Sequence, residues 1–129
     1  TARQKKVSDL HNRVALVNGT EGAVLLSIHQ NSLPSSTVTH GAQVFWNSKE
    51  GADALAQSVQ DALNTAVNVG NEKKTKAIPA TIYLMKNVNA PGILVECGFL
   101  SNREETAMLQ QPAYQTRLAA AITAGCLAS

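Results

Sequence analysis

The chain has 129 residues, of which 44% are hydrophobic, and this length suits a single domain over residues 1–129. Eleven basic and nine acidic side chains give a net charge of +2 and are dispersed along the chain, which disfavours a nucleic-acid partner. Because the longest apolar runs are far shorter than the ~20 residues that span a bilayer, we expect no membrane span.

The first predicted element is an amphipathic helix with Ser8 as its N-cap and an end near residues 18–19. Residues 23–28 then form an almost continuous apolar run, which is typical of a strand covered on both faces. The run ends at His29, and a polar loop over residues 32–40 follows.

Residues 42–46 are predicted to form a second strand, followed by a helix over about residues 49–65 with an apolar stripe. The segment 68–76 is polar and basic, which indicates a loop, and a short strand is predicted around residues 81–84. Residues 93–97 have the pattern of a second fully buried strand.

Two overlapping capping boxes within residues 101–105 predict a helix that stops near Pro112, and a last helix is predicted over residues 113–127. Helices that alternate with buried strands indicate an α/β domain. We therefore expect a mixed, largely parallel sheet with helices on both faces.

His29 and Glu96 are each the first strongly polar side chain after a buried apolar run. In open α/β sheets, ligand sites form beyond the carboxyl ends of the strands, so we expect both side chains in one site. A neutral imidazole is a common zinc ligand, and a carboxylate beside it can take a proton from metal-bound water. A hydrolytic pair is the hypothesis that follows.

Two segments carry a family resemblance: residues 27–31 (SIHQN) and residues 94–102 (LVECGFLSN). They resemble the signature motifs of the zinc-dependent N-acetylmuramoyl-L-alanine amidases, which cut peptidoglycan between muramic acid and the first L-alanine of the stem peptide. Residues 74–78 and 83–86 look most like the branch of that family that acts on the spore cortex during sporulation and germination. Further similarity lies in Ser8-Asp9-Leu10, Arg13, residues 41–45, Leu55-Ala56, Gln60 and Tyr114-Gln115.

The resemblance implies a three-layer α/β/α amidase fold, Zn²⁺ as cofactor and peptidoglycan as substrate. It implies that His29 is the second histidine ligand of the zinc and that Glu96 is the catalytic acid and base. The implied location is extracytoplasmic, in the cell envelope or around the spore cortex.

The family pattern normally opens with a strand that ends in Gly-His and with a Glu on the following helix, and these supply the other two zinc ligands. We expect this chain to be the C-terminal portion of the domain, without that first strand and helix. With His29 as its one ligand, the chain is expected to bind zinc poorly unless an N-terminal segment or an activating protein completes the site. The sheet edge left unpaired is expected to be prone to association.

Three further side chains are candidates for substrate binding: Asn31, His40 and Lys76. Asn31 is two residues beyond the candidate ligand, although an Asx-type turn accounts for it equally well. His40 closes the polar loop, and Lys76 belongs to a small basic run that is by default a solvated loop. Arg13 is a candidate for holding a carboxylate, but pairing on the helix surface is favoured over that role.

Two other functions remain open at this point. The first alternative to the amidase is a catalytically incomplete remnant that binds muropeptides or has a regulatory role. The second is a cysteine hydrolase in which Cys97 is the nucleophile and His29 its base. For Cys97 and Cys126, two buried thiols are favoured over a disulfide.

Overall fold

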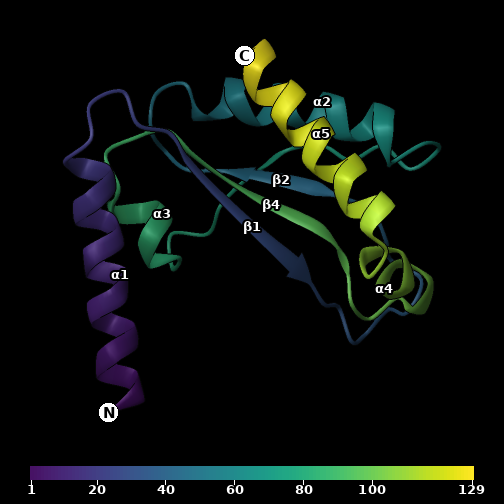
Figure 1. Cartoon of the computed structure of the whole chain (residues 1–129), viewed down its shortest axis with the longest axis horizontal. Coiled ribbons are helices and arrows are strands. Elements are labelled where there is room, and N and C mark those ends of the chain that lie inside the picture. The colour runs from purple at the N-terminus through teal and green to yellow at the C-terminus, as the bar shows by residue number, and fades with distance from the viewer.

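A computed structural model describes residues 1–129 (Figure 1). Its sheet has four strands in the order β1-β4-β2-β3. Strand β1 runs parallel to β4, β4 antiparallel to β2, and β2 parallel to β3. The predicted mixed sheet, with parallel pairings in the majority, is confirmed. The strands are β1 (Leu25–Asn31), β2 (Gln43–Trp46), β3 (Lys76–Ala77) and β4 (Gly92–Phe99).

Helices lie on both sides of this sheet, as predicted (Figure 1). Helices α2 (Ala52–Ala66) and α5 (Pro112–Ala128) cover one face. Helices α1 (Ala2–Asn18) and α3 (Tyr83–Asn87) lie on the other side, and α4 (Arg103–Leu109) follows the end of β4. No helix has the length and apolar character needed to cross a membrane.

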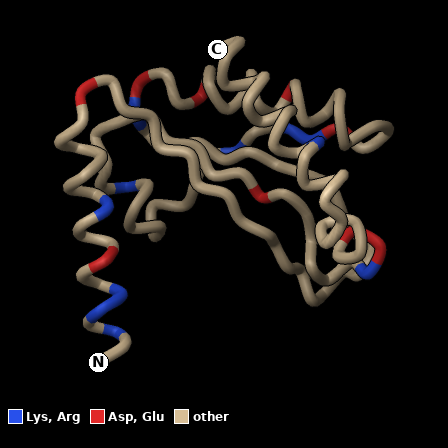
Figure 2. The backbone as a smooth tube through the Cα atoms, in the orientation of Figure 1, with Lys and Arg blue, Asp and Glu red and all other residues tan.

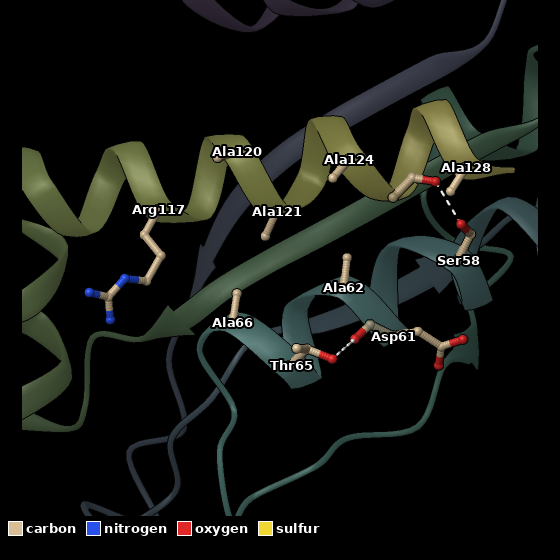
Figure 3. A pocket seen from close by; sticks show the side chains of 11 residues that line it. Ser58, Asp61, Ala62, Thr65, Ala66, Arg117, Ala120, Ala121, Ala124 and Ala128 are labelled. Atoms are coloured by element: carbon tan, nitrogen blue, oxygen red, sulfur yellow. Dashed lines mark hydrogen bonds between the residues drawn. The ribbon is translucent and has the colours of Figure 1, made fainter.

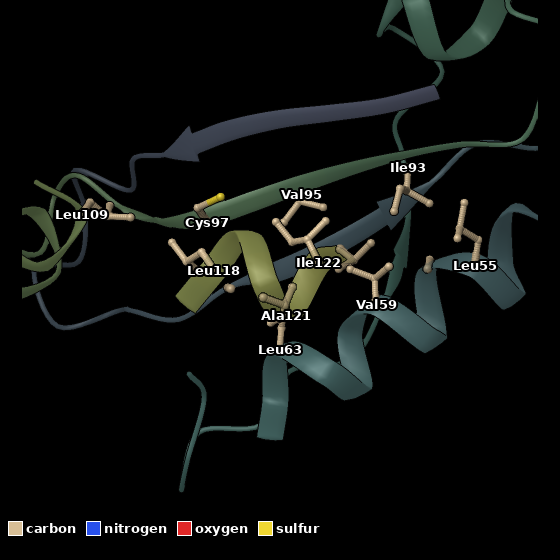
Figure 4. Packing of buried hydrophobic residues seen from close by; sticks show 13 residues of the cluster. Leu55, Val59, Leu63, Ile93, Val95, Cys97, Leu109, Leu118, Ala121 and Ile122 are labelled. Atoms are coloured by element: carbon tan, nitrogen blue, oxygen red, sulfur yellow. The ribbon is translucent and has the colours of Figure 1, made fainter. Parts of the chain in front are cut away.

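The main core lies between the sheet and the helices α2 and α5 (Figure 4). Alternate residues of β4 point into it, because successive side chains of a strand face opposite sides of the sheet. The side chains that fill the core are apolar, including Ile93, Val95 and Cys97 of β4, Leu55, Val59 and Leu63 of α2, and Leu118 and Ile122 of α5. Leu94 and Glu96 therefore face the side of α1 and α3.

Helices α2 and α5 pack closely because Gly125 has no side chain. A Cβ atom built on Gly125 would lie 2.5 Å from the Cα atom of Val59. Ser58 Oγ also donates a hydrogen bond of 2.6 Å to the carbonyl oxygen of Gly125. Beside this contact the two helices leave an open groove of about 720 Å³, lined largely by alanine (Figure 3).

One predicted strand feature is wrong. Strand β1 is not covered on both faces, since Leu26 and Ile28, which share the face of Ile93 and Val95, stay exposed. It is also an edge strand that pairs with β4 alone. Leu26 is 40% exposed and Ile28 58% exposed. An apolar run reports the hydrophobicity of a segment but not how many neighbours cover it.

The strand predicted around residues 81–84 is also wrong, since these residues lead into the short helix α3, and the strand β3 lies earlier, at Lys76–Ala77. The amide of Ile82 donates to the carbonyl oxygen of Pro79, which starts a helical turn. Short apolar runs do not distinguish helix from strand. The first helix also begins earlier than predicted, because Thr1 and Gln4 form its capping box.

Candidate functional site

His29 and Glu96 are direct neighbours across the parallel pairing of β1 with β4. Both lie inside their strands rather than beyond them, because β1 continues to Asn31 and β4 to Phe99. The expected position at the carboxyl edge is therefore corrected: the two side chains lie on a face of the sheet, near its carboxyl end. Neighbouring residues of paired strands point to the same side, so His29 and Glu96 share the face that bears α1 and α3.

A cavity of about 480 Å³ opens over these two side chains. Its floor is formed by β1 and β4, and its walls by α1 and the segment that enters α3. The charged and polar groups among its lining residues include Lys6, Arg13, Ser27, His29, Tyr83 and Glu96. The red segment within β4 in Figure 2 is Glu96, the acidic residue of that strand, and α1 carries several basic residues in the same view.

Glu96 is the most unusual group of the cavity. Its Oε2 atom is buried and has no hydrogen-bond partner. Burial raises the pKa of the Glu96 carboxyl above its usual value, and the charge of His29 partly offsets this effect. A carboxylate with a free oxygen and a raised pKa is suited to accept a proton and to return it.

His29 is exposed to solvent and is oriented by its own strand. A hydrogen bond of 2.7 Å joins His29 Nε2 to Ser27 Oγ, two residues earlier on the same face. The ring is accessible from the cavity, and a ligand that takes Nε2 displaces this contact. The imidazole therefore has the exposure that a metal ligand or a proton carrier needs.

The residues of this chain do not by themselves fit a catalytic zinc ion. Catalytic zinc normally has three protein ligands and one open position. No group of three histidine, cysteine, aspartate or glutamate side chains in the chain could hold a metal. His29 offers one imidazole, and Glu96 is the one carboxylate beside it.

The other predicted substrate contacts lie outside this cavity. Asn31 ends β1 and accepts a hydrogen bond from the amide of the next residue, Ser32, which is a local contact but not an Asx-type turn. His40 lies 3.3 Å from the side chain of Asn71 and borders a separate cavity of about 650 Å³. Lys76 lies on β3, at the opposite edge of the sheet from β1. Their contacts with a substrate stay predictions.

Cys97 points away from His29, into the core on the face covered by α5 (Figure 4). Burial, and to a smaller extent the charge of Glu96, raises the pKa of its thiol to about 11. Both cysteines are free, as favoured from the sequence, but only Cys97 is buried and Cys126 is half-buried. A buried, protonated thiol on the far side of the sheet cannot use His29 as its base, so the geometry does not support a cysteine hydrolase.

The sequence did not indicate that Lys6 and Tyr83 border the same cavity as His29. Lys6 lies on a helix that was predicted to begin only after Ser8, and Tyr83 lies where a strand was predicted. Arg13 forms the favoured helix-surface pair, with Asp9 at 2.9 Å, and also lines the cavity.

Comparison with known proteins gives consistent matches. A family model described as N-acetylmuramoyl-L-alanine amidase matches residues 1–128. The chain is 40% identical over 125 residues to a germination-specific N-acetylmuramoyl-L-alanine amidase of Bacillus subtilis (strain 168), covering 96% of this chain and 52% of that protein. It is 29% identical over 119 residues to the N-acetylmuramoyl-L-alanine amidase LytC of the same organism, covering 90% of this chain and 23% of LytC.

Solved structures agree with these matches. The CwlD amidase of Clostridioides difficile, solved in complex with the GerS lipoprotein, superposes with a TM-score of 0.90 at 34% identity, covering 99% of this chain and 64% of that one. An N-acetylmuramoyl-L-alanine amidase from Clostridium difficile 630 superposes with a TM-score of 0.82 at 30% identity, covering 92% and 63%. The chain thus spans about half of the germination-specific relative and less than two thirds of these structures.

Proposed function

The chain belongs to the N-acetylmuramoyl-L-alanine amidase family, and from that membership we propose that its protein hydrolyses peptidoglycan. The bond cleaved is the amide between N-acetylmuramic acid and the L-alanine of the stem peptide. Residues 1–129 are, in our proposal, the C-terminal portion of one catalytic domain; they cover 52% of the germination-specific relative and 64% of the CwlD chain.

The unpartnered carboxylate of Glu96 is the observation that carries the proposal. Glu96 takes a proton from the attacking water, whose oxygen forms the new bond to the lactyl carbonyl carbon. Glu96 then delivers this proton to the alanine nitrogen as the amide C–N bond breaks. The products are a lactyl carboxylate and a peptide with a free amino group. A pKa raised by burial favours the second step, because the protonated carboxyl is then more accessible near neutral pH.

Zinc is the cofactor that we propose, with His29 as one of its ligands and the remaining ligands supplied by groups outside these 129 residues. A zinc ion held there would supply Lewis-acid chemistry to the site. His29 would have to give up the contact of its Nε2 with Ser27 Oγ to use that nitrogen as a ligand.

The proposed setting is the cell envelope or the spore cortex region of a bacterium, where the substrate is found. The germination-specific relative supports the cortex assignment. We also propose that an activating protein, or an N-terminal segment, completes the site, since CwlD was solved with a lipoprotein bound.

Two substitutions in the protein that carries this chain test the proposal. Glu96→Gln is expected to lower kcat for muropeptide hydrolysis by about 10²- to 10⁴-fold with zinc content unchanged, because the proton carrier is lost. His29→Ala is expected to reduce bound zinc as well as activity. Glu50→Gln, which neutralises an exposed acid before α2, is the control. Full activity of Glu96→Gln would contradict the proposal.

A second candidate function is a muropeptide-binding or regulatory remnant, which the absence of a three-ligand group favours. Metal analysis and hydrolysis assays separate the two functions. Muropeptide binding without zinc and without hydrolysis in the protein that carries the chain would favour the remnant. Stoichiometric zinc that is lost in His29→Ala would exclude it.

A further inference from the structure

Two cationic side chains of α1 line the cavity that holds His29 and Glu96, and the proposed hydrolysis does not use them. Lys6 and Arg13 are about two helical turns apart, so they lie on one face of the helix, roughly 10 Å apart along its axis. Leu10 lies between them and also lines the cavity. This wall of α1 therefore carries two cationic side chains separated by an apolar one, and Arg13 is paired with Asp9.

Both cations retain free hydrogen-bond donors. Arg13 uses its Nε atom to contact Asp9 Oδ2 at 2.9 Å, and its terminal nitrogens make no hydrogen bond within the chain. Lys6 makes no ion pair. A guanidinium pairs well with a carboxylate through two parallel hydrogen bonds, so the wall is suited to bind acidic groups of a ligand.

Contacts of α1 with the α3 segment hold this wall in place. The rings of His11 and Tyr83 stack with centroids 5.3 Å apart and planes inclined by 5°. At the end of α1, Asn18 donates to the carbonyl oxygen of Asn87 at 3.2 Å and accepts from the amide of Asn89 at 2.6 Å. These contacts keep Lys6 and Arg13 beside the cavity without drawing them onto Glu96, whose Oε2 atom stays unpartnered.

We propose that Lys6 and Arg13 bind carboxylate groups of the peptide part of the substrate, so that the cavity selects peptides with free carboxylates over amidated ones. This inference rests on the proposed function, because it assigns to the cavity the peptide released when the amide next to alanine is cleaved. The apolar lining residues Leu10 and Leu94 offer contacts for an alanine methyl group. The cations then meet acidic groups that follow this alanine.

Calorimetric binding of two matched peptides to the full chain tests the inference. The probes are the dipeptide L-alanyl-D-glutamate and the same dipeptide with its α-carboxylate amidated. The free acid is expected to bind roughly tenfold more tightly, and Lys6→Gln and Arg13→Gln are each expected to remove a large part of this preference. Lys5→Gln and Arg3→Gln remove the same charge from exposed positions of α1 outside the cavity lining. These two control variants are expected to keep the preference for the free acid.

Equal affinity for the two peptides, absence of binding, or an equal loss in the control variants would overturn the inference. Circular dichroism checks that each variant keeps its helix content. Hydrolysis by the protein that carries the chain is measured separately on free and amidated muropeptides. Hydrolysis of the free and the amidated muropeptide at equal kcat/KM contradicts the inference but leaves the proposed function standing. Tighter binding of the free-acid peptide without hydrolysis of either muropeptide contradicts the proposed function but leaves the inference standing.

Discussion

Glu96 and Cys97 are adjacent residues with opposite surroundings, because successive side chains of β4 face opposite sides of the sheet. Glu96 faces the cavity with His29, whereas Cys97 lies in the core with Leu118. Burial raises the pKa of both groups. In the cavity this effect supports proton transfer, and in the core it keeps the thiol protonated and unreactive.

We expect Cys97 to resist alkylation in the folded chain. At about pH 8 its thiol, with a pKa of about 11, is almost entirely protonated, and the thiolate is the nucleophile. Iodoacetamide is expected to modify Cys97 roughly tenfold or more slowly in the folded chain than in the unfolded chain, as measured by peptide mass spectrometry. The half-buried Cys126 serves as the internal comparison.

The contribution of the Cys97 thiol to the stability of the folded chain decreases at alkaline pH. Because the folded pKa of about 11 lies above the reference value of 9.0, the thiol's contribution to stability is complete below about pH 9 and declines as the pH rises toward 11. Alkylation of folded Cys97 should therefore accelerate over this range. A rate near pH 8 equal to that of the unfolded chain would contradict the buried position.

At the level of elements, Glu105 ties α4 to the sheet. Its carboxylate is 2% exposed and accepts hydrogen bonds from the amides of Gly41 and Phe99 at 2.6–3.0 Å. Gly98 leaves room for it, since a Cβ atom there would lie 2.7 Å from the carboxyl group. The start of β2, the end of β4 and the start of α4 thus meet at one carboxylate, and the β4 residue that it binds, Phe99, is three positions beyond Glu96.

Glu105→Ala is expected to lower the free energy of unfolding by about 3 kcal/mol, because the amides of Gly41 and Phe99 lose their buried acceptor. Urea unfolding of the full chain measures this change. The neighbouring Glu104→Ala removes the same charge from an exposed position and is expected to change the free energy by less than about 0.5 kcal/mol. Equal effects of the two substitutions would show that the buried contacts do not matter.

At the level of the whole molecule, the sheet has an open edge at β1. The outer edge of this strand carries unpaired backbone groups, and Val24, Leu26 and Ile28 are 54%, 40% and 58% exposed. An exposed apolar edge strand favours pairing with another chain. The self-association of the chain that was expected from the sequence therefore involves the exposed edge of β1.

We predict that the 129-residue chain self-associates through this edge and that Ile28→Lys weakens the association, because a charge on an edge strand opposes pairing. Sedimentation velocity over a range of concentrations measures it. Val69→Lys introduces the same charge at a side chain that is 81% exposed and lies outside the sheet, and it is expected to leave the association unchanged. A monomer at every concentration would contradict the prediction.

Elements whose signals are local and long could be predicted from the amino-acid sequence alone. The helices near residues 52–66 and 112–128 and the strand near residues 92–99 appear close to their predicted limits. The sequence also predicted that His29 and Glu96 lie together, because the ends of parallel strands meet at one edge of a sheet. Their chemical roles remain the proposal made above.

The exposure of each element and the set of distant residues that share a cavity became known from the three-dimensional packing. The edge position of β1, the antiparallel pairing of β2 and the helical form of residues 83–87 depend on contacts that periodicity does not encode. The same holds for the wall formed by Lys6 and Arg13, which reaches His29 and Glu96 only because α1 packs against α3. Hydrophobic pattern reports which side chains avoid water, whereas the fold decides which neighbours they meet.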